Sequence, residues 1–212
     1  ANNAHGLTHY EQVVDFRSFP VLEQLAMHYG EPFADFSMLP EYFLSRFAAT
    51  QVKVALSGDG ADEIFAGYER YLAMRCFEYL DWTPDFLKQW GVRLLQYFPD
   101  GGKRSRIGRS KRLLKIAAAP VERRYFELMA QATETERRGL YGERMTAAGL
   151  SDSARILQRL ARSAGSLSKI ERCQEVDLGS YLCGDILVKV DRAAMANSLE
   201  VRSPFLDTAV VE

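Results

Sequence analysis

Long apolar runs and paired cysteines are missing from this chain. No stretch approaches the roughly 20 apolar residues that a bilayer-spanning helix needs, and the start lacks the basic and apolar segments of a signal peptide. The three cysteines, Cys76, Cys173 and Cys183, form no C-x-x-C pair, so neither a zinc site nor a disulfide framework is expected. These absences favour reduced thiols in a cytoplasmic protein with no membrane partner.

A dominant sign of charge is missing as well. The net charge is −1, which gives no reason to expect nucleic acid as a partner. The basic run from Lys103 to Arg112 contains no aromatic residues, which favours a solvated loop over a nucleic-acid surface. Apolar residues make up 47% of the chain, enough for a soluble globular core. The missing initiating Met, and an end at Glu212 just as a new apolar segment begins near Leu206, predict a piece of a longer protein.

Hydrophobic periodicity predicts an α/β layer that gives way to a mostly helical remainder. Short strands are expected at Tyr10–Val14 and Val52–Leu56, the second one a buried parallel strand. Helices are expected over the ranges Phe19–Tyr29, Leu39–Ala49, Ile64–Tyr79 and Leu167–Leu199, the last broken near Cys183-Gly184. Strand signals end near residue 80, which predicts a division of one domain into an α/β part, residues 1–80, and a mostly helical part, residues 81–212.

The turn from Ser57 to Glu63 is the most informative segment. It follows a strand and precedes a helix, and Gly58 and Gly60 permit a tight turn with close approach by a ligand. Asp59, Asp62 and Glu63 place carboxylates in the same turn. Because carboxylates repel phosphate but hold Mg²⁺ together with substrate phosphates, the turn predicts handling of a Mg²⁺–phosphate group.

The same acids also fit a purely structural role. Asp59 could cap the following helix, with Asp62 and Glu63 in its first turn, where acids are favoured by the helix dipole without any ligand. The turn is not a Walker A loop, because Gly-Lys-Ser/Thr is absent from it.

Three segments in order resemble the asparagine synthetase family. Val54–Tyr68, with the sequence VALSGDGADEIFAGY, is similar to the family signature Leu-Ser-Gly-Glu/Asp-Gly-x-Asp-Glu-x-Phe-x-Gly-Tyr. Asp185–Asp207 resembles the C-terminal signature, and Glu31–Pro40 a third family segment. The resemblance covers most of the chain outside about residues 81–165.

The resemblance implies a fold and a reaction. The fold is the doubly wound parallel sheet of the N-type ATP pyrophosphatases. The reaction uses ATP and Mg²⁺ to adenylate the side-chain carboxylate of aspartate, and ammonia from an N-terminal glutaminase domain then gives asparagine, AMP and pyrophosphate. Neither that domain nor the family's pyrophosphate loop, Ser-Gly-Gly-x-Asp-Ser, is found in the chain. The chain alone is therefore expected to be inactive. The incomplete sheet would expose apolar edges, which is compatible with oligomerisation, for example a homodimer, or with disorder.

The resemblance also implies roles for single residues. Asp62 matches the acid that holds Mg²⁺, and Asp59 stands where many members have Glu, a residue assigned to catalysis. Lys189 and Arg192 are the cations of the C-terminal signature; one of them would meet pyrophosphate, and Lys189 is favoured. A further set would line the nucleotide or aspartate pocket: Ser57, Gly58 and Gly60.

Two other functions remain open from the sequence. A related adenylating enzyme of the amidotransferase or β-lactam synthetase type would use another carboxylate. A non-catalytic scaffold domain is of a different class, and the retained acids and Lys189 argue against it.

Overall fold

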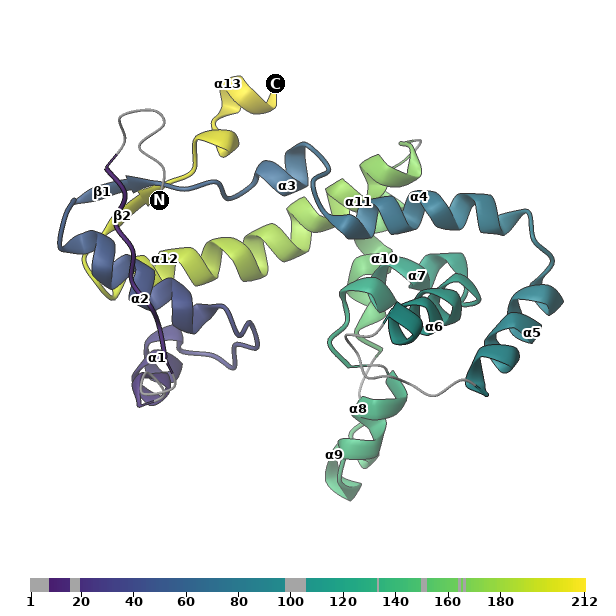
Figure 1. The fold of residues 1–212 in the computed structure, drawn as a ribbon. Helices are drawn as coiled ribbons and strands as arrows, with labels where there is room; N and C mark the ends of the chain where they lie inside the picture. The colour runs from purple at the N-terminus through teal and green to yellow at the C-terminus, as the bar shows by residue number, and fades with distance from the viewer. Residues whose placement is uncertain are drawn as a thin grey trace. The chain divides into compact units, whose positions relative to one another are not determined.

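The computed structural model describes residues 8–15, 20–97, 106–132, 134–149, 152–163, 165 and 167–212. They fall into two compact units along the chain: residues up to Ala61 together with Tyr181–Glu212, and Asp62–Ser180. Figure 1 shows the ribbon with its helices and strands labelled. The division at residue 80 that the sequence suggests stays a prediction. Part of the basic run, residues 103–105, lies outside the described residues.

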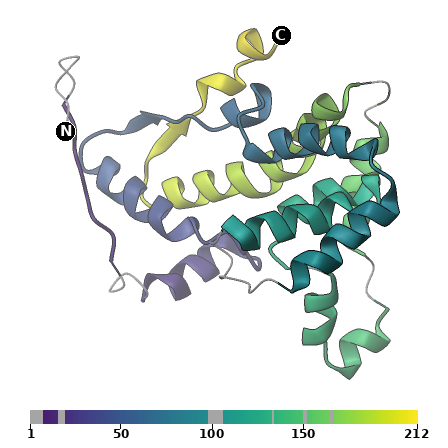
Figure 2. The same cartoon turned by 45° about the vertical axis from the view of Figure 1, so that its right-hand side comes forward.

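Helices α2 and α12 form the centre of the first unit. Its elements are α1 (Val21–Tyr29), α2 (Met38–Ala49), β1 (Val54–Leu56), α12 (Leu187–Met195), β2 (Glu200–Arg202), η3 (Pro204–Leu206) and α13 (Thr208–Val211). Helix α12 packs on both α1 and α2, and the side-by-side course of α2 and α12 can be followed in Figures 1 and 2. The buried apolar side chains of this unit include Leu25, Val190, Ala193, Ala194 and Leu199.

A two-stranded parallel sheet pairs β1 with β2 in the first unit. The register places Val54 opposite Glu200 and Leu56 opposite Arg202. The predicted parallel strand is therefore confirmed. The prediction that this strand is buried is wrong, because Val54 and Leu56 are 44% and 73% exposed. The partner β2 was not expected from the sequence. The strand predicted at Tyr10–Val14 is also wrong, because these residues have no strand partner in the described part of the chain.

The second unit is helical over its described residues. Its elements are α4 (Glu69–Asp81), α5 (Asp85–Gln96), α6 (Arg106–Ala117), α7 (Val121–Met129), α8 (Glu134–Leu140), α9 (Glu143–Ala147), α10 (Ala154–Ser163) and α11 (Lys169–Asp177), preceded by the short helix α3 (Ala61–Ile64), which begins one residue before the unit. Helix α4 packs on α6, α7 and α11. Their shared core contains Tyr71, Met74, Phe77, Ile116, Tyr125 and Val176.

Two predicted helices differ from the observed ones. The range Ile64–Tyr79 is interrupted, because the chain turns between α3 and α4 and Ala66 adopts a φ of +55° there. The expected break at Cys183-Gly184 does not occur. Instead, a π-helix, η2 (Leu178–Ile186), joins α11 to α12. The predicted helices at Phe19–Tyr29 and Leu39–Ala49 are confirmed as α1 and α2, with Phe19 itself outside the described residues.

The fold class is mixed α/β, mostly helical, with a small parallel sheet. Among the helices of the described residues, none combines the length and the apolar character needed to span a bilayer.

Candidate functional site

The turn after β1 is built around Gly60. This residue has a φ of +88°, a conformation that L side chains rarely adopt. A Cβ built on it would lie 2.2 Å from Cδ2 of Leu206, so any other residue would also have to displace the Leu206 side chain. A side chain on Gly58 would meet no atom of the described residues within 4 Å. The turn is therefore tightly packed at Gly60 and open at Gly58.

Ser57 ties this turn to the second family-like segment. Its backbone N–H donates to the carbonyl oxygen of Arg202 at 2.9 Å, and its hydroxyl lies 3.0 Å from the hydroxyl of Ser203. These contacts extend the β1–β2 pairing by one residue. Two segments that are nearly 150 positions apart in the sequence are thus brought together within the first unit.

Asp59 lies in the same turn with its carboxylate unpaired. Among the described residues, no hydrogen bond or ion pair to this carboxylate occurs, so the alternative role of Asp59 as a helix cap finds no support. Burial and the nearby charge of Asp59 together raise the pKa of Glu41 on α2. The end of β1 therefore carries an acidic group beside a second carboxyl that holds its proton more tightly than usual.

Asp62 belongs to the second unit and is exposed. Like Asp59, its carboxylate has no partner among the residues that the structure describes. Its neighbour Glu63 is only 1% exposed and accepts a hydrogen bond from the hydroxyl of Tyr68 at 2.7 Å. Of the two first-turn acids of α3, one thus faces solvent and the other the protein interior.

Lys189 lies on α12 and forms an ion pair in the first unit. Its Nζ is 2.8 Å from Oδ2 of Asp35, and its carbonyl oxygen accepts from the hydroxyl of Tyr29 at 2.9 Å. Burial is the largest single influence on the pKa of Lys189 and lowers it, but the hydrogen bond to Asp35 and the nearby negative charges, chiefly those of Asp35 and Asp185, together outweigh burial, so the pKa is raised. Lys189 is therefore a largely buried, charged side chain that already has a partner.

Asp35 was not among the residues singled out from the sequence, although its segment carries a family resemblance. Its Oδ1 accepts from the backbone N–H of Ser37 at 2.8 Å and from the Ser37 hydroxyl at 2.7 Å. Burial raises the pKa of Asp35, but the hydrogen bonds from Lys189 and Ser37 hold it below its ordinary value. A loop acid placed two residues before a serine was the available signal, since this spacing favours local hydrogen bonding.

Asp185 is a second acid that the sequence analysis did not single out as a candidate site residue. Its Oδ1 is buried and has no hydrogen-bond partner in the described part of the chain. Burial, followed by the charge of Asp35, raises its pKa, while Lys189 acts in the opposite direction. Asp35, Asp185 and Lys189 therefore form one electrostatically coupled group.

Arg192 differs from Lys189 in its surroundings. It is exposed on α12, and within the described ranges its guanidinium has no hydrogen-bond or ion-pair partner. Only its backbone is engaged, because the carbonyl oxygen lies 3.0 Å from Nε2 of His28. Arg192 is thus available to an external anion, whereas Lys189 is occupied by Asp35.

The described residues offer carboxylate oxygens that could bind Mg²⁺, but they do not form a complete set of metal ligands. Among the described residues, no three His, Cys, Asp or Glu side chains gather closely enough to hold a metal ion. Mg²⁺ commonly uses one or two carboxylates and completes its shell with water and substrate phosphates. The unpartnered, exposed carboxylate of Asp62 fits that requirement.

Comparison with known proteins defines the class of this chain. It belongs to the asparagine synthase family, whose model matches residues 1–212. The chain is 34% identical over 194 residues to "Asparagine synthetase [glutamine-hydrolyzing] 1" of Bacillus subtilis, covering 90% of this chain and 29% of that protein. It is 37% identical over 212 residues to "Putative asparagine synthetase [glutamine-hydrolyzing]" of Mycobacterium tuberculosis, covering 98% of this chain and 30% of the relative. The family resemblance is confirmed.

The matched region is a small part of these relatives. The chain spans about 30% of their length. A shorter match, 38% identical over 74 residues, is to "Putative asparagine synthetase [glutamine-hydrolyzing] 2" of Methanocaldococcus jannaschii, covering 35% of this chain and 14% of that protein. No solved structure matches the chain significantly.

Proposed function

We propose that this chain is part of the synthetase domain of a cytoplasmic, glutamine-dependent asparagine synthetase. The domain would have the doubly wound sheet of the N-type ATP pyrophosphatases, with β1 and β2 as two of its parallel strands. Ligands in such sheets bind beyond the carboxyl ends of the strands. The single observation that carries the proposal is the pairing of β1 with β2, which places the Ser57–Gly60 turn beside Ser203 at that end.

The proposed reaction has two steps. A side-chain carboxylate oxygen of aspartate attacks the α-phosphorus of ATP, and the bond to pyrophosphate breaks. The nitrogen of ammonia then attacks the acyl carbon, and the bond to AMP breaks as the amide forms. The relatives are named glutamine-hydrolyzing, which supports ammonia supplied by a glutaminase domain outside this chain. Positioning and charge neutralisation would carry most of the catalysis.

Particular residues would divide this work. Asp62 would hold Mg²⁺, which supplies positive charge to offset the negative charge of the triphosphate. Asp59, with its unpaired carboxylate at the end of β1, would orient the reacting groups or accept a proton. The pocket would be lined by Ser57, Gly58 and Gly60.

The two cations of α12 would have different roles. The guanidinium of Arg192 is exposed and lacks a partner among the described residues, which suits contact with pyrophosphate. Lys189 is held 2.8 Å from Asp35 and would instead keep α12 and the Asp35 loop in place.

Pyrophosphate release by the full-length gene product tests this proposal. The assay supplies ATP, Mg²⁺, aspartate and either ammonium or glutamine. Asp62→Asn is expected to lower the rate on the order of 100-fold, the size of effect seen when one electrostatic contact is removed from a transition state. Glu69→Gln is the matched control, because Glu69 is also an exposed first-turn acid, on α4. A folded wild-type protein without aspartate-dependent release would overturn the proposal.

A further inference from the structure

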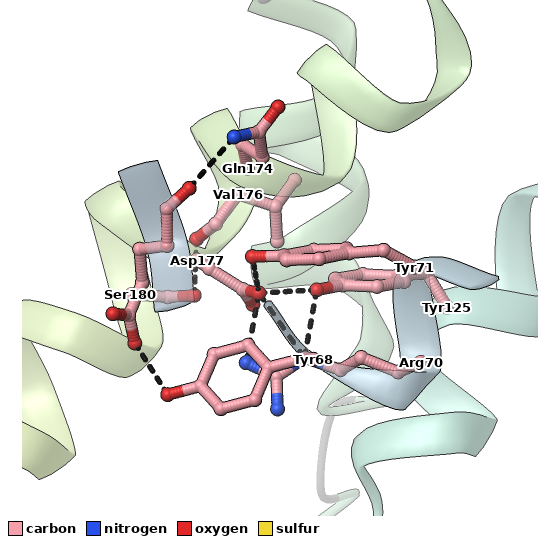
Figure 3. Close-up of polar contacts among 9 residues, drawn as sticks. Tyr68, Arg70, Tyr71, Tyr125, Gln174, Val176, Asp177 and Ser180 are labelled. Atoms are coloured by element: carbon pink, nitrogen blue, oxygen red, sulfur yellow. Dashed lines mark hydrogen bonds and ion pairs between the residues drawn. The ribbon is translucent and has the colours of Figure 1, made fainter. Parts of the chain in front are cut away.

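Asp177, at the end of α11, is the centre of a buried polar network in the second unit (Figure 3). It is 0% exposed, and its Oδ2 accepts from the hydroxyls of Tyr71, at 2.5 Å, and Tyr125. The guanidinium of Arg70 donates to the same oxygen from Nε at 3.1 Å and from Nη2 at 2.8 Å. The network joins α4, α7 and α11, so it fixes the direction of α11 within its unit.

Arg70 connects this centre to the acid that neighbours Asp62. Its guanidinium carbon lies 3.5 Å from the centre of the Tyr68 ring, a close cation–π contact. The hydroxyl of Tyr68 donates to Oε1 of the buried Glu63. The side chain next to Asp62 is therefore held through Tyr68 and Arg70 to Asp177.

Gln174 forms a second connection from the same helix. Its Nε2 donates to the carbonyl oxygens of Glu63 at 2.8 Å and Ile64 at 2.9 Å. These carbonyls belong to the last residues of α3, where a helix leaves acceptors without an internal partner. Gln174 and Asp177 are three residues apart and so project from the same face of α11. The segment that carries Asp62 is thus connected to one face of α11 in two ways: directly through Gln174, and through Tyr68 and Arg70 to Asp177.

The space around Asp62 is restricted as well. The backbone N–H of Gly67 donates to the Asp62 carbonyl oxygen at 2.9 Å and closes the turn between α3 and α4. A Cβ on Gly67 would lie 2.1 Å from Oδ1 of Asp62. The carboxylate therefore rests against Gly67 in a defined position, although it makes no hydrogen bond with the described residues.

We propose that Gln174 and Tyr68 are positioning residues that hold the Asp62 carboxylate in place for Mg²⁺. This inference rests on the proposed function, because it needs Asp62 to be a metal ligand. Neither residue contacts the metal in this assignment. Gln174 acts through the carbonyl oxygens of Glu63 and Ile64, Tyr68 acts through the carboxylate of Glu63, and the closed turn at Gly67 transmits the constraint. Groups that orient metal ligands typically change metal affinity by 10- to 100-fold when they are removed.

The test uses two variants and one matched control in the full-length protein. Gln174→Leu removes the donors to α3, and Tyr68→Phe removes the hydroxyl that binds Glu63 while keeping the ring beneath Arg70. Ser168→Ala is the control, because Ser168 caps the same helix, α11, and accepts from the Glu171 N–H at 3.3 Å without contacting α3. It weakens α11 without touching the proposed connections.

Two readouts separate the inference from the proposed function. Hydrogen exchange of the amides from Asp62 to Tyr68 can be measured on an inactive protein. The Mg²⁺ concentration for half-maximal pyrophosphate release can be measured only on an active enzyme. We expect both variants to exchange faster in this segment and to require ~10-fold more Mg²⁺, with near-normal release at saturating Mg²⁺. Ser168→Ala should change neither readout, although it lowers the melting temperature.

Each departure from this pattern has its own meaning. An active wild type whose variants keep the Mg²⁺ dependence of the control overturns the positioning role and leaves the proposed function standing. An inactive but folded wild type whose variants still exchange faster only in this segment overturns the proposed function and supports the structural constraint on Asp62. Inactivity together with unchanged exchange overturns both.

Discussion

Lys189 Nζ lies 2.8 Å from Asp35 Oδ2, although the two residues are 154 positions apart in the chain. Both side chains are largely buried, with 11% and 19% of their surfaces exposed. The pair joins α12 to the loop before α2, and Ser37 holds the far oxygen of Asp35. This contact links the third family-like segment to the C-terminal one within the first unit.

The first prediction concerns the strength of this pair. A double-mutant cycle of Lys189→Met and Asp35→Asn should give a coupling free energy of about 1.5–3 kcal/mol, the range for hydrogen bonds to charged groups with limited solvent screening. The measurement is the free energy of unfolding from urea denaturation of the full-length protein.

The exposed pair Arg202–Glu200 provides the control for that cycle. Its atoms are 2.7 Å apart, but its side chains are 66% and 55% exposed. Solvent screening should therefore reduce its coupling to roughly 0–1 kcal/mol. Equal coupling in the two pairs would show that burial does not strengthen the Lys189–Asp35 interaction.

The second prediction is the pH range over which this pair stabilises the protein. The pKa of Asp35 is lowered from 3.8, so its contribution is complete above that value and is lost as the pH falls through the lower, folded-state pKa. The pKa of Lys189 is raised from 10.5, so its contribution is complete below 10.5 and is lost as the pH rises through the folded-state pKa.

The stability difference between wild type and the Lys189→Met/Asp35→Asn variant should therefore be flat from about pH 5 to pH 9. It should shrink in strong acid and in strong base. Urea denaturation at a series of pH values measures it. A difference that rises or falls steadily across the neutral range would contradict the assignment of these two shifts to the pair.

Local features of the chain were predictable because they depend on neighbouring residues. The β-branched run before Ser57 specified a strand, and Gly60 specified the turn that its positive φ confirms. Gly30 likewise ended α1 with a left-handed cap at φ +75°. By contrast, the left-handed conformation of Ala66 has no local signal, since alanine rarely adopts it. The interruption between α3 and α4 therefore could not be seen in the helical pattern.

The long-range features could not be predicted for a different reason. Strand β2 has only three residues, Glu-Val-Arg, and it becomes a strand because β1 lies beside it. Asp177 occupies an ordinary polar position in a helical sequence, and only the arrival of Tyr71 and Tyr125 from other helices makes it a buried acceptor. Burial and the nearby Asp177 charge raise the pKa of both tyrosines, a perturbation that no single segment encodes.

The third prediction tests the space that Asp62 needs. Gly67→Ala places a methyl group where a Cβ would lie 2.1 Å from Asp62 Oδ1, so the carboxylate has to move. The Mg²⁺ concentration for half-maximal pyrophosphate release should rise about 10-fold, as for other changes that misplace a metal ligand.

Gly142→Ala is the control for this substitution. A Cβ on Gly142 would meet no atom of the described residues within 4 Å. The variant should keep the wild-type Mg²⁺ dependence and should change the unfolding free energy by no more than about 0.5–1 kcal/mol. An unchanged Mg²⁺ requirement in Gly67→Ala would mean that the position of the Asp62 carboxylate does not limit activity.

The fourth prediction separates the two cations of α12. Arg192→Gln removes an exposed guanidinium without a partner in the described part of the chain, so the unfolding free energy should change by about 0.5 kcal/mol or less. Pyrophosphate release should fall by about 10²-fold, because a charge that neutralises the leaving group in the transition state is lost. Arg46→Gln, which removes an exposed arginine on α2, should alter neither quantity.

Lys189→Met should behave in the opposite way to Arg192→Gln. The substitution leaves Asp35 without its cation, so it should lower the free energy of unfolding. The protein that remains folded at low temperature should retain most of its pyrophosphate release. Assays of both variants below their melting temperatures, with circular dichroism to confirm folding, measure the two effects separately. Loss of release in well-folded Lys189→Met together with full activity in Arg192→Gln would reverse the assignment. Lys189 would then have to leave Asp35 to meet pyrophosphate, and its ion pair would describe only the state without substrate.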